Sequence, residues 1–193
     1  MNNIEIYDNV ISREGCNKII EYFDGSPKKS FALTVDCIVK KDKNGMDIGV
    51  YFSHCEKSMY HLILEYIQPA LDQGLERYKK KYPFINRGIA KWILEDGFNI
   101  QKFDGKEEGY FATHCEAGGP SLSRRVLVWM IYLNNAKCGT RFYYPTRDVK
   151  AKEGRLVLWP AYIKHRVETN TTDDDRISIS FNIKITGSNQ QPL

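Results

Sequence analysis

A chain of 193 residues is long enough to bury one hydrophobic core and short for two, so we expect a single domain. Apolar residues make up 42% of the chain and charged residues 27%, which is ordinary for a soluble globular protein. The net charge of +4 comes from short basic runs and not from a continuous basic stripe, which argues against a nucleic-acid partner.

Neither export nor a membrane anchor is indicated. Residues 1–10 contain no basic stretch followed by an apolar run, so they do not resemble a signal peptide. No segment approaches the roughly 20 apolar residues that span a bilayer. The cysteines are odd in number and form no CxxC pair, as is typical of reduced thiols: Cys16, Cys37, Cys55, Cys115 and Cys138. We expect a cytoplasmic monomer or weak dimer with no membrane partner.

One short strand and two helices are predicted in the first half of the chain. The strand covers 4–9, and Ser12 offers an N-cap for a helix that ends at Phe23. A longer helix is predicted over about 56–80, with Pro69 as a possible point of kinking. Its apolar residues recur every three or four positions: Tyr60, Ile63, Leu64, Ile67, Leu71, Leu75 and Tyr78.

From Phe98 onward the apolar pattern changes to period two, which predicts strands. Turns that contain Gly, Pro, Asn or Asp separate them, as in an antiparallel sandwich or jelly roll. The predicted strands are 98–103, 110–116, 126–134, 141–144, 155–159, 165–169 and 176–184. The strand 126–134 is apolar on both faces, so we expect it to be central and covered on both sides. We also expect the N-terminal helices to cover the outer face of one sheet.

His114 and Glu116 are separated by one residue in a predicted strand, so their side chains should point to the same side. His165, which opens a later strand, can supply a third ligand. Two histidines and one carboxylate form the facial triad of Fe(II) oxygenases, which leaves cis coordination positions open. A lone HxE triplet is weak support, since such triplets occur by chance in many strands. His54 and His61 have no such partners, and we interpret them as structural.

Arg176 strengthens the interpretation of the triad. It lies eleven residues after His165, across the turn 170–174, so the two residues could lie on adjacent antiparallel strands about 5 Å apart. A planar guanidinium binds a carboxylate bidentately and stays charged, which suits a carboxylate co-substrate. The strand that begins at Arg176 alternates polar with apolar residues, and we expect its polar face to line a pocket and not to face solvent.

The sequence resembles the 2-oxoglutarate- and Fe(II)-dependent oxygenases, specifically the prolyl 4-hydroxylase-like catalytic domain. The stretches that carry the resemblance are "IYDNVISREGCNKIIEYF", "GYFATHCE", "RVLVWMIYLNNAKCGTRFYYP", "KEGRLVLWPAYIKHRV" and "DRISISFNI". The resemblance implies a mainly β fold with N-terminal helices, a double-stranded β-helix (jelly roll, cupin-like). It divides the single domain 1–193 into a strand and supporting helices over 1–93, a jelly-roll core over 94–185 and a flexible tail over 186–193.

Carried onto this chain, the resemblance makes His114, Glu116 and His165 the iron ligands and Arg176 the partner of the distal 2-oxoglutarate carboxylate. Tyr132 falls where related enzymes place a tyrosine that contacts the same carboxylate, with a core aromatic as the alternative. Substrate contacts are implied for two further residues, Arg125 and Tyr110; for Arg125 a simple surface charge is an equal alternative. The implied cofactor is Fe(II), with 2-oxoglutarate and O2 as co-substrates and ascorbate as a possible reductant.

Three departures from the family pattern concern the substrate more than the reaction class. Glu116 replaces the usual aspartate, Arg176 stands where collagen-type enzymes have lysine, and Phe103 lies near the place of a pocket tyrosine. The function implied is hydroxylation of a prolyl residue in a peptide or protein, with succinate and CO2 as co-products. The alternatives are a hydroxylase of a free amino acid or other small molecule, a cupin-like metal protein, and a catalytically silent binding module.

Overall fold

The computed structural model describes residues 3–31, 43–86 and 91–186. The first helix, α1 (Arg13–Gly25), begins where predicted, because the Ser12 side chain accepts a hydrogen bond from the amide of Gly15. The long helix is α2 (Lys57–Leu62) and α3 (Gln68–Lys81), joined by one π-helical stretch, Ile63–Ile67. Pro69 lies in the first turn of α3, where its missing amide hydrogen costs little.

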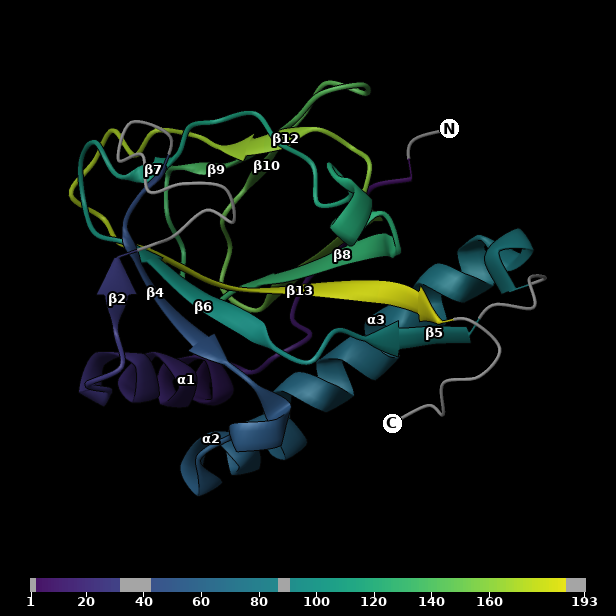
Figure 1. The fold of residues 1–193 in the computed structure, drawn as a ribbon. Coiled ribbons are helices and arrows are strands. Elements are labelled where there is room, and N and C mark those ends of the chain that lie inside the picture. Colours follow the sequence, from purple (N-terminus) through teal and green to yellow (C-terminus); the bar gives the residue numbers. More distant parts are fainter. Residues whose placement is uncertain (1–2, 32–42, 87–90, 187–193) are drawn as a thin grey trace.

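The strands form one large and two small antiparallel sheets (Figure 1). The large sheet has the order β1-β11-β8-β13-β6-β4-β2, with β5 also paired to β13; the small sheets are β10-β9-β12 and β3-β7. The strands are β1 (Glu5–Tyr7), β2 (Ser30–Phe31), β3 (Lys43–Asn44), β4 (Met46–Val50), β5 (Lys91–Leu94), β6 (Phe98–Phe103), β7 (Gly109–Tyr110), β8 (Arg125–Tyr132), β9 (Gly139–Phe142), β10 (Arg147–Lys150), β11 (Arg155–Pro160), β12 (His165–Val167) and β13 (Arg176–Thr186). Short 3-10 turns cover Phe52–His54, Pro83–Asn86 and Pro120–Leu122.

Strand β8 explains why two hydrophobic cores form. Its odd-numbered residues, such as Trp129 and Ile131, face the helices, and its even-numbered residues, such as Met130 and Tyr132, face the small sheet. Figure 1 shows the helices below the large sheet and strands β9, β10 and β12 above it. The prediction that this strand is central and covered on both sides is confirmed, as is the mainly β fold with helices on one face of a sheet.

Strand β13 separates an apolar face from a polar one. On its apolar face, β13 contributes four residues to the core between the large sheet and the helices: Ile177, Ile179, Phe181 and Ile183. On the opposite face Arg176, Ser180, Asn182 and Lys184 line a cleft between the two sheets. The predicted pocket-lining face of this strand is therefore present.

Two predictions about the site region are wrong. The segment 110–116 is not one strand: β7 ends at Tyr110, and His114 pairs with His165 through an isolated bridge. Glu116 and Ala117 form a turn directly after this bridge, and the 3-10 turn Pro120–Leu122 follows, so no strand reaches Glu116. His165 and Arg176 also do not lie on adjacent strands, because β12 pairs with β9 and β13 belongs to the large sheet. The segment between them crosses from one sheet to the other.

Other differences concern short elements. The sequence does not predict β2, β3, β4, β5 and β10, each at most five residues long. Cys16, Cys55, Cys115 and Cys138 are free thiols, whereas Cys37 and the predicted tail beyond Thr186 lie outside the described residues. Within the described ranges, no helix is both long enough and apolar enough to cross a bilayer.

Gly74 provides a test of how helix α3 packs on the sheet. A Cβ atom at Gly74 would lie against Leu156 of β11, which is fully buried. We predict that Gly74→Ala lowers the free energy of unfolding by about 1–3 kcal/mol, because overpacking forces the helix from the sheet. Gly25→Ala is the matched control, since a Cβ there meets nothing within 4 Å. Urea denaturation of both variants checks this; equal stability would show that α3 does not pack as described.

Candidate metal centre and co-substrate site

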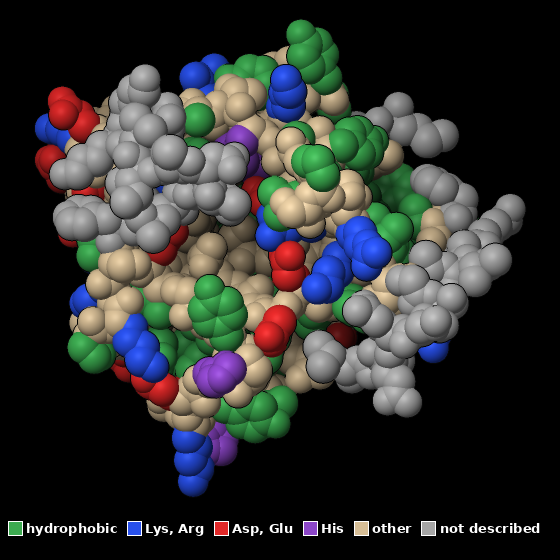
Figure 2. All heavy atoms as spheres, in the orientation of Figure 1, with side chains coloured by type: hydrophobic (Ala, Val, Ile, Leu, Met, Phe, Trp, Pro, Cys, Tyr) green, Lys and Arg blue, Asp and Glu red, His purple; other side chains and the backbone are tan. Residues whose placement is uncertain are grey.

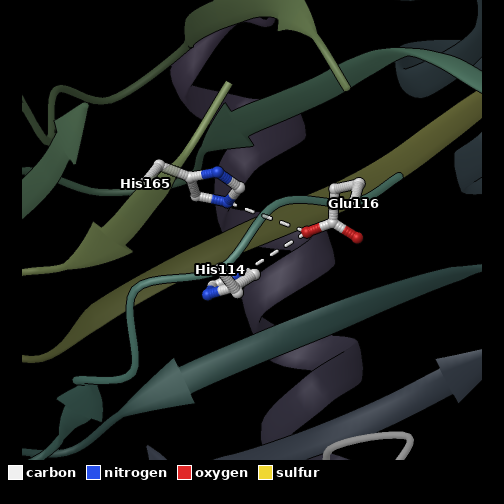
Figure 3. A group of neighbouring side chains, drawn as sticks. All are labelled: His114, Glu116 and His165. Atoms are coloured by element: carbon white, nitrogen blue, oxygen red, sulfur yellow. Dashed lines mark ion pairs between the residues drawn. The ribbon is translucent and has the colours of Figure 1, made fainter. Parts of the chain in front are cut away.

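His114, Glu116 and His165 meet at one point between the sheets (Figure 3). Their ligand atoms all lie within 4.8 Å of one another. The Nε2 atoms of His114 and His165 lie 3.5 and 3.7 Å from the same carboxylate oxygen, Oε1 of Glu116. The three residues predicted from the sequence are thus brought together, although from a bridge and a turn and not from one strand.

Backbone hydrogen bonds place the two histidines opposite each other. The amide of His114 donates to the carbonyl of His165 at 3.0 Å, and the amide of His165 donates to the carbonyl of His114 at 2.8 Å. This bridge connects the loop that carries Glu116 to strand β12 of the small sheet. Glu116 lies in the turn that follows, two residues beyond the bridge.

Each histidine ring is held with its Nε2 atom toward the centre. The Nδ1 atom of His114 lies 2.9 Å from the carbonyl of Ala112, and that of His165 lies 3.1 Å from the carbonyl of Ile163. A carbonyl can only accept, so Nδ1 carries a proton, and in the neutral form of a ring held in this way the lone pair lies on Nε2. This is the tautomer that a metal requires, and the carbonyl partners fix the ring orientation.

Aromatic rings enclose both imidazoles. Tyr110 stacks on His114 with the ring centroids 3.9 Å apart. Trp159 meets His165 in an edge-type contact, and the ring of Phe142 lies tilted beside His165. Burial lowers the pKa of His165 to about 4, so this ring is neutral at pH 7. A neutral, fixed ring can bind a metal without first losing a proton.

Glu116 carries the negative charge of the centre. Burial alone would raise the pKa of Glu116, but the neighbouring side chains of His114, His165 and Arg125 hold it at about 2. Its second oxygen, Oε2, lies 3.3 Å from Nη1 of Arg125. Two imidazoles and one carboxylate, all converging, fit the ligand set of a non-haem Fe(II) site.

The triad lines a cleft of about 1020 Å³ that opens on one face of the molecule (Figure 2). Figure 2 shows this face hollowed at its centre, with acidic and basic side chains along one edge of the hollow. The wall contains Met130 of β8, Thr140 of β9 and Arg176 of β13 in addition to the triad. The sequence-predicted residues Tyr110 and Arg125 also line the cleft.

Arg176 is the most unusual side chain of the cleft. It is fully buried, and no acidic residue in the described part of the chain forms an ion pair with it. Its guanidinium donates to the neutral acceptors Ser178 Oγ at 3.2 Å, Thr140 Oγ1 at 3.4 Å and Met130 Sδ at 3.6 Å, and its Nε has no partner. A buried charge without a counter-charge is costly, so this site fits an anionic ligand.

Tyr132 lies next to Arg176 but contacts another residue with its hydroxyl. The ring lies 5.0 Å from the Arg176 guanidinium, and the hydroxyl lies 2.7 Å from Thr140 Oγ1. Thr140 therefore connects Tyr132 to Arg176 and itself lines the cleft. Thr140 is not among the site residues predicted from the sequence, although it shares a face of β9 with Phe142, which packs beside His165.

Residues 111–182 match the model of a family described as putative 2OG-Fe(II) oxygenase. The predicted family resemblance is confirmed. The matched region contains His114, Glu116, His165 and Arg176. No curated protein sequence matches the chain.

Solved structures show the same 2OG-Fe(II) oxygenase fold. A prolyl-4-hydroxylase from Pseudomonas putida is 14% identical with a TM-score of 0.69, over 97% of this chain and 95% of that one. A prolyl hydroxylase in complex with a hypoxia inducible factor peptide fragment, from Trichoplax adhaerens, is 14% identical with a TM-score of 0.72, over 95% and 84%. The non-heme alpha ketoglutarate dependent epimerase SnoN from nogalamycin biosynthesis is 12% identical with a TM-score of 0.67, over 100% and 88%. These likenesses confirm the double-stranded β-helix.

The isolation of Arg176 leads to a prediction about stability. Replacing a buried charge by an apolar side chain of similar length removes its desolvation cost, which is often neutral or stabilising by about 1–4 kcal/mol. We predict that Arg176→Met raises the melting temperature of the protein when no ligand is added. Thermal melting followed by circular dichroism checks this. A loss of several kcal/mol would mean that Arg176 is a structural residue.

Proposed function

We propose that the protein is an Fe(II)- and 2-oxoglutarate-dependent dioxygenase that hydroxylates a prolyl residue in a peptide or protein. The observation that carries the proposal is Arg176, a buried guanidinium in the same cleft as a His-Glu-His triad; no acidic side chain of the described residues forms an ion pair with it. A metal centre alone would give the charge of Arg176 no role. A dicarboxylate co-substrate can bind the metal with one end and Arg176 with the other. The match of residues 111–182 supports the same reaction class.

In this proposal His114, Glu116 and His165 hold Fe(II), and Arg176 binds the distal carboxylate of 2-oxoglutarate with Thr140 beside it. Bound Fe(II) would supply activation of O2 coupled to oxidative decarboxylation of 2-oxoglutarate, with succinate and CO2 as products. The Nδ1 contacts of both histidines keep Nε2 available for the metal. The aromatic rings around His165 exclude water from that side of the centre. A retained carboxylate at Glu116 favours hydroxylation over halogenation, because a halide needs that ligand position.

The substrate side of the cleft is polar. Asn99 of β6 and Asn182 of β13 line it with Ser180, and the Oδ1 atom of Asn182 is buried without a partner. Amides and hydroxyls of this kind can form hydrogen bonds with the amide groups of a peptide, and they therefore support a peptidyl substrate. A free amino acid or another small molecule is the second candidate, favoured by the SnoN likeness, because that relative is named as acting in nogalamycin biosynthesis.

We predict that Fe(II) and 2-oxoglutarate, added without oxygen, give a weak metal-to-ligand charge-transfer band in the visible range. His165→Ala should abolish this band, because it removes one of the two nitrogen ligands. His61→Ala is the control, since His61 is exposed on helix α2. Anaerobic absorption spectroscopy checks this, and an unchanged band in His165→Ala would remove His165 from the metal site.

We predict that Arg176→Met weakens 2-oxoglutarate binding by tens- to thousands-fold while Fe(II) binding is kept. Loss of one partner of a buried charge pair costs about 2–5 kcal/mol. Titration of the anaerobic iron protein with 2-oxoglutarate measures this. Arg13→Met is the control, because Arg13 is exposed and far from the cleft in a surface ion pair with Glu153. Unchanged 2-oxoglutarate affinity in Arg176→Met contradicts the carboxylate site.

We predict a mass gain of one oxygen atom in a prolyl peptide that is incubated with the protein, Fe(II), 2-oxoglutarate and O2. Mass spectrometry of peptide pools and metabolite pools, run in parallel, separates the two substrate candidates. Glu116→Ala should form no hydroxylated product under equal iron loading, because the anionic ligand is lost. Oxygen insertion into metabolites alone would favour the small-molecule candidate. Full hydroxylation by Glu116→Ala would show that Glu116 is not a ligand.

A further inference from the structure

The two carboxylate oxygens of Glu116 have different partners. Oε1 faces the Nε2 atoms of His114 and His165 at 3.5 and 3.7 Å. Oε2 points away from them and lies 3.3 Å from Nη1 of Arg125. The same nitrogen donates to the backbone carbonyl of Glu116 at 3.4 Å. One oxygen of this carboxylate therefore faces the proposed metal position, and the other contacts the guanidinium of Arg125.

Arg125 is itself held in place by a second carboxylate. Its Nη2 atom lies 2.8 Å from Oε2 of Glu95, and its Nε donates to Oε1 of Glu95 at 3.3 Å. The amide of Glu95 donates to the carbonyl of Asn182 on β13, which fixes the loop that carries it. A bidentate contact of this kind fixes the plane of the guanidinium and leaves Nη1 directed at Glu116. The Arg125 side chain is 16% exposed, so water screens these contacts little.

We propose that Arg125 is a positioning residue for Glu116 and not a substrate contact. By holding Oε2, Arg125 makes Glu116 a ligand through one oxygen only and directs Oε1 to the metal position. The longer side chain of glutamate is what allows one acid to reach both the arginine and the metal position. This inference rests on the proposed metal centre, and it replaces the substrate role that the family resemblance implies for Arg125.

The first test measures the metal centre directly, without turnover. Arg125→Met should raise the dissociation constant of Fe(II) by about 10–100-fold, the usual effect of removing a partner of a metal ligand. It should also shift the absorption maximum of the anaerobic Fe(II)–2-oxoglutarate band, because Oε2 becomes free to bind the metal. Arg125→Lys keeps the charge and should restore part of the affinity. Arg124→Met is the matched control, because Arg124 is the exposed preceding residue and lies outside the triad's contacts.

The second test combines Arg125→Met with Glu116→Asp. An aspartate is one methylene shorter and cannot reach both the metal position and Arg125. Arg125→Met should therefore change the Fe(II) dissociation constant less than about threefold in the Glu116→Asp background, far less than in the wild-type protein. Equal effects in both backgrounds would overturn the proposal, because they would show that Arg125 acts independently of Glu116.

The outcomes separate this inference from the proposed function. If the wild-type protein binds no Fe(II), the proposed function fails and the inference fails with it. If the wild-type protein binds Fe(II) and Arg125→Met binds it equally with an unchanged band, the inference alone fails, and a raised KM for substrate would assign Arg125 to substrate binding. If Arg125→Met does not fold, Glu95→Gln decides, because it removes the support of Arg125 without touching a ligand. A several-fold weaker Fe(II) affinity in Glu95→Gln supports the proposal, and an unchanged affinity overturns it.

Discussion

The pair of backbone hydrogen bonds between His114 and His165 is the constraint on which the site depends. Without this bridge, the loop after β7 would have no fixed relation to the small sheet, and the two imidazoles would not face each other. Glu116 follows the bridge by two residues, so its position also depends on it. The two hydrogen bonds are short-range, yet they join segments about 50 residues apart in sequence. The loop that carries Glu116 is thereby fixed to strand β12 of the small sheet.

Charge in the cleft is arranged to attract an anion. The triad has a single carboxylate, which would neutralise only half of the charge of a divalent metal. Arg176 adds a buried positive charge that has no acidic partner in the described part of the chain. Arg125, in contrast, lies between the carboxylates of Glu95 and Glu116. The two arginines of the cleft therefore differ in their capacity to bind an anion. Two carboxylates neutralise Arg125, whereas Arg176 can pair with an anionic ligand. That difference comes from their neighbours and not from the residue type.

The fold could be predicted largely from apolar periodicity. Strand β6 has the bounds that period two indicates, and β8 was recognised as central because it is apolar on both faces. Ser12 marked the start of α1 through its capping side chain. The short strands β2 to β5 and β10 were missed, because two to five residues carry too little pattern to be distinguished from a loop. Their pairing is decided by neighbouring strands.

The residue types and order along the chain determined which chemistry the protein can hold. His114, Glu116, His165 and Arg176 could be selected from the sequence because an HxE triplet, a later histidine and an arginine at a strand start occur together. Their arrangement could not be derived in the same way. The sequence suggested one strand for His114 and Glu116 and adjacent strands for His165 and Arg176, whereas a bridge, a turn and two facing sheets place them. Tertiary structure alone decided that, among the described residues, Arg176 has no acidic partner while Arg125 has two. Such contacts join segments far apart in the sequence, and local periodicity carries no information about them.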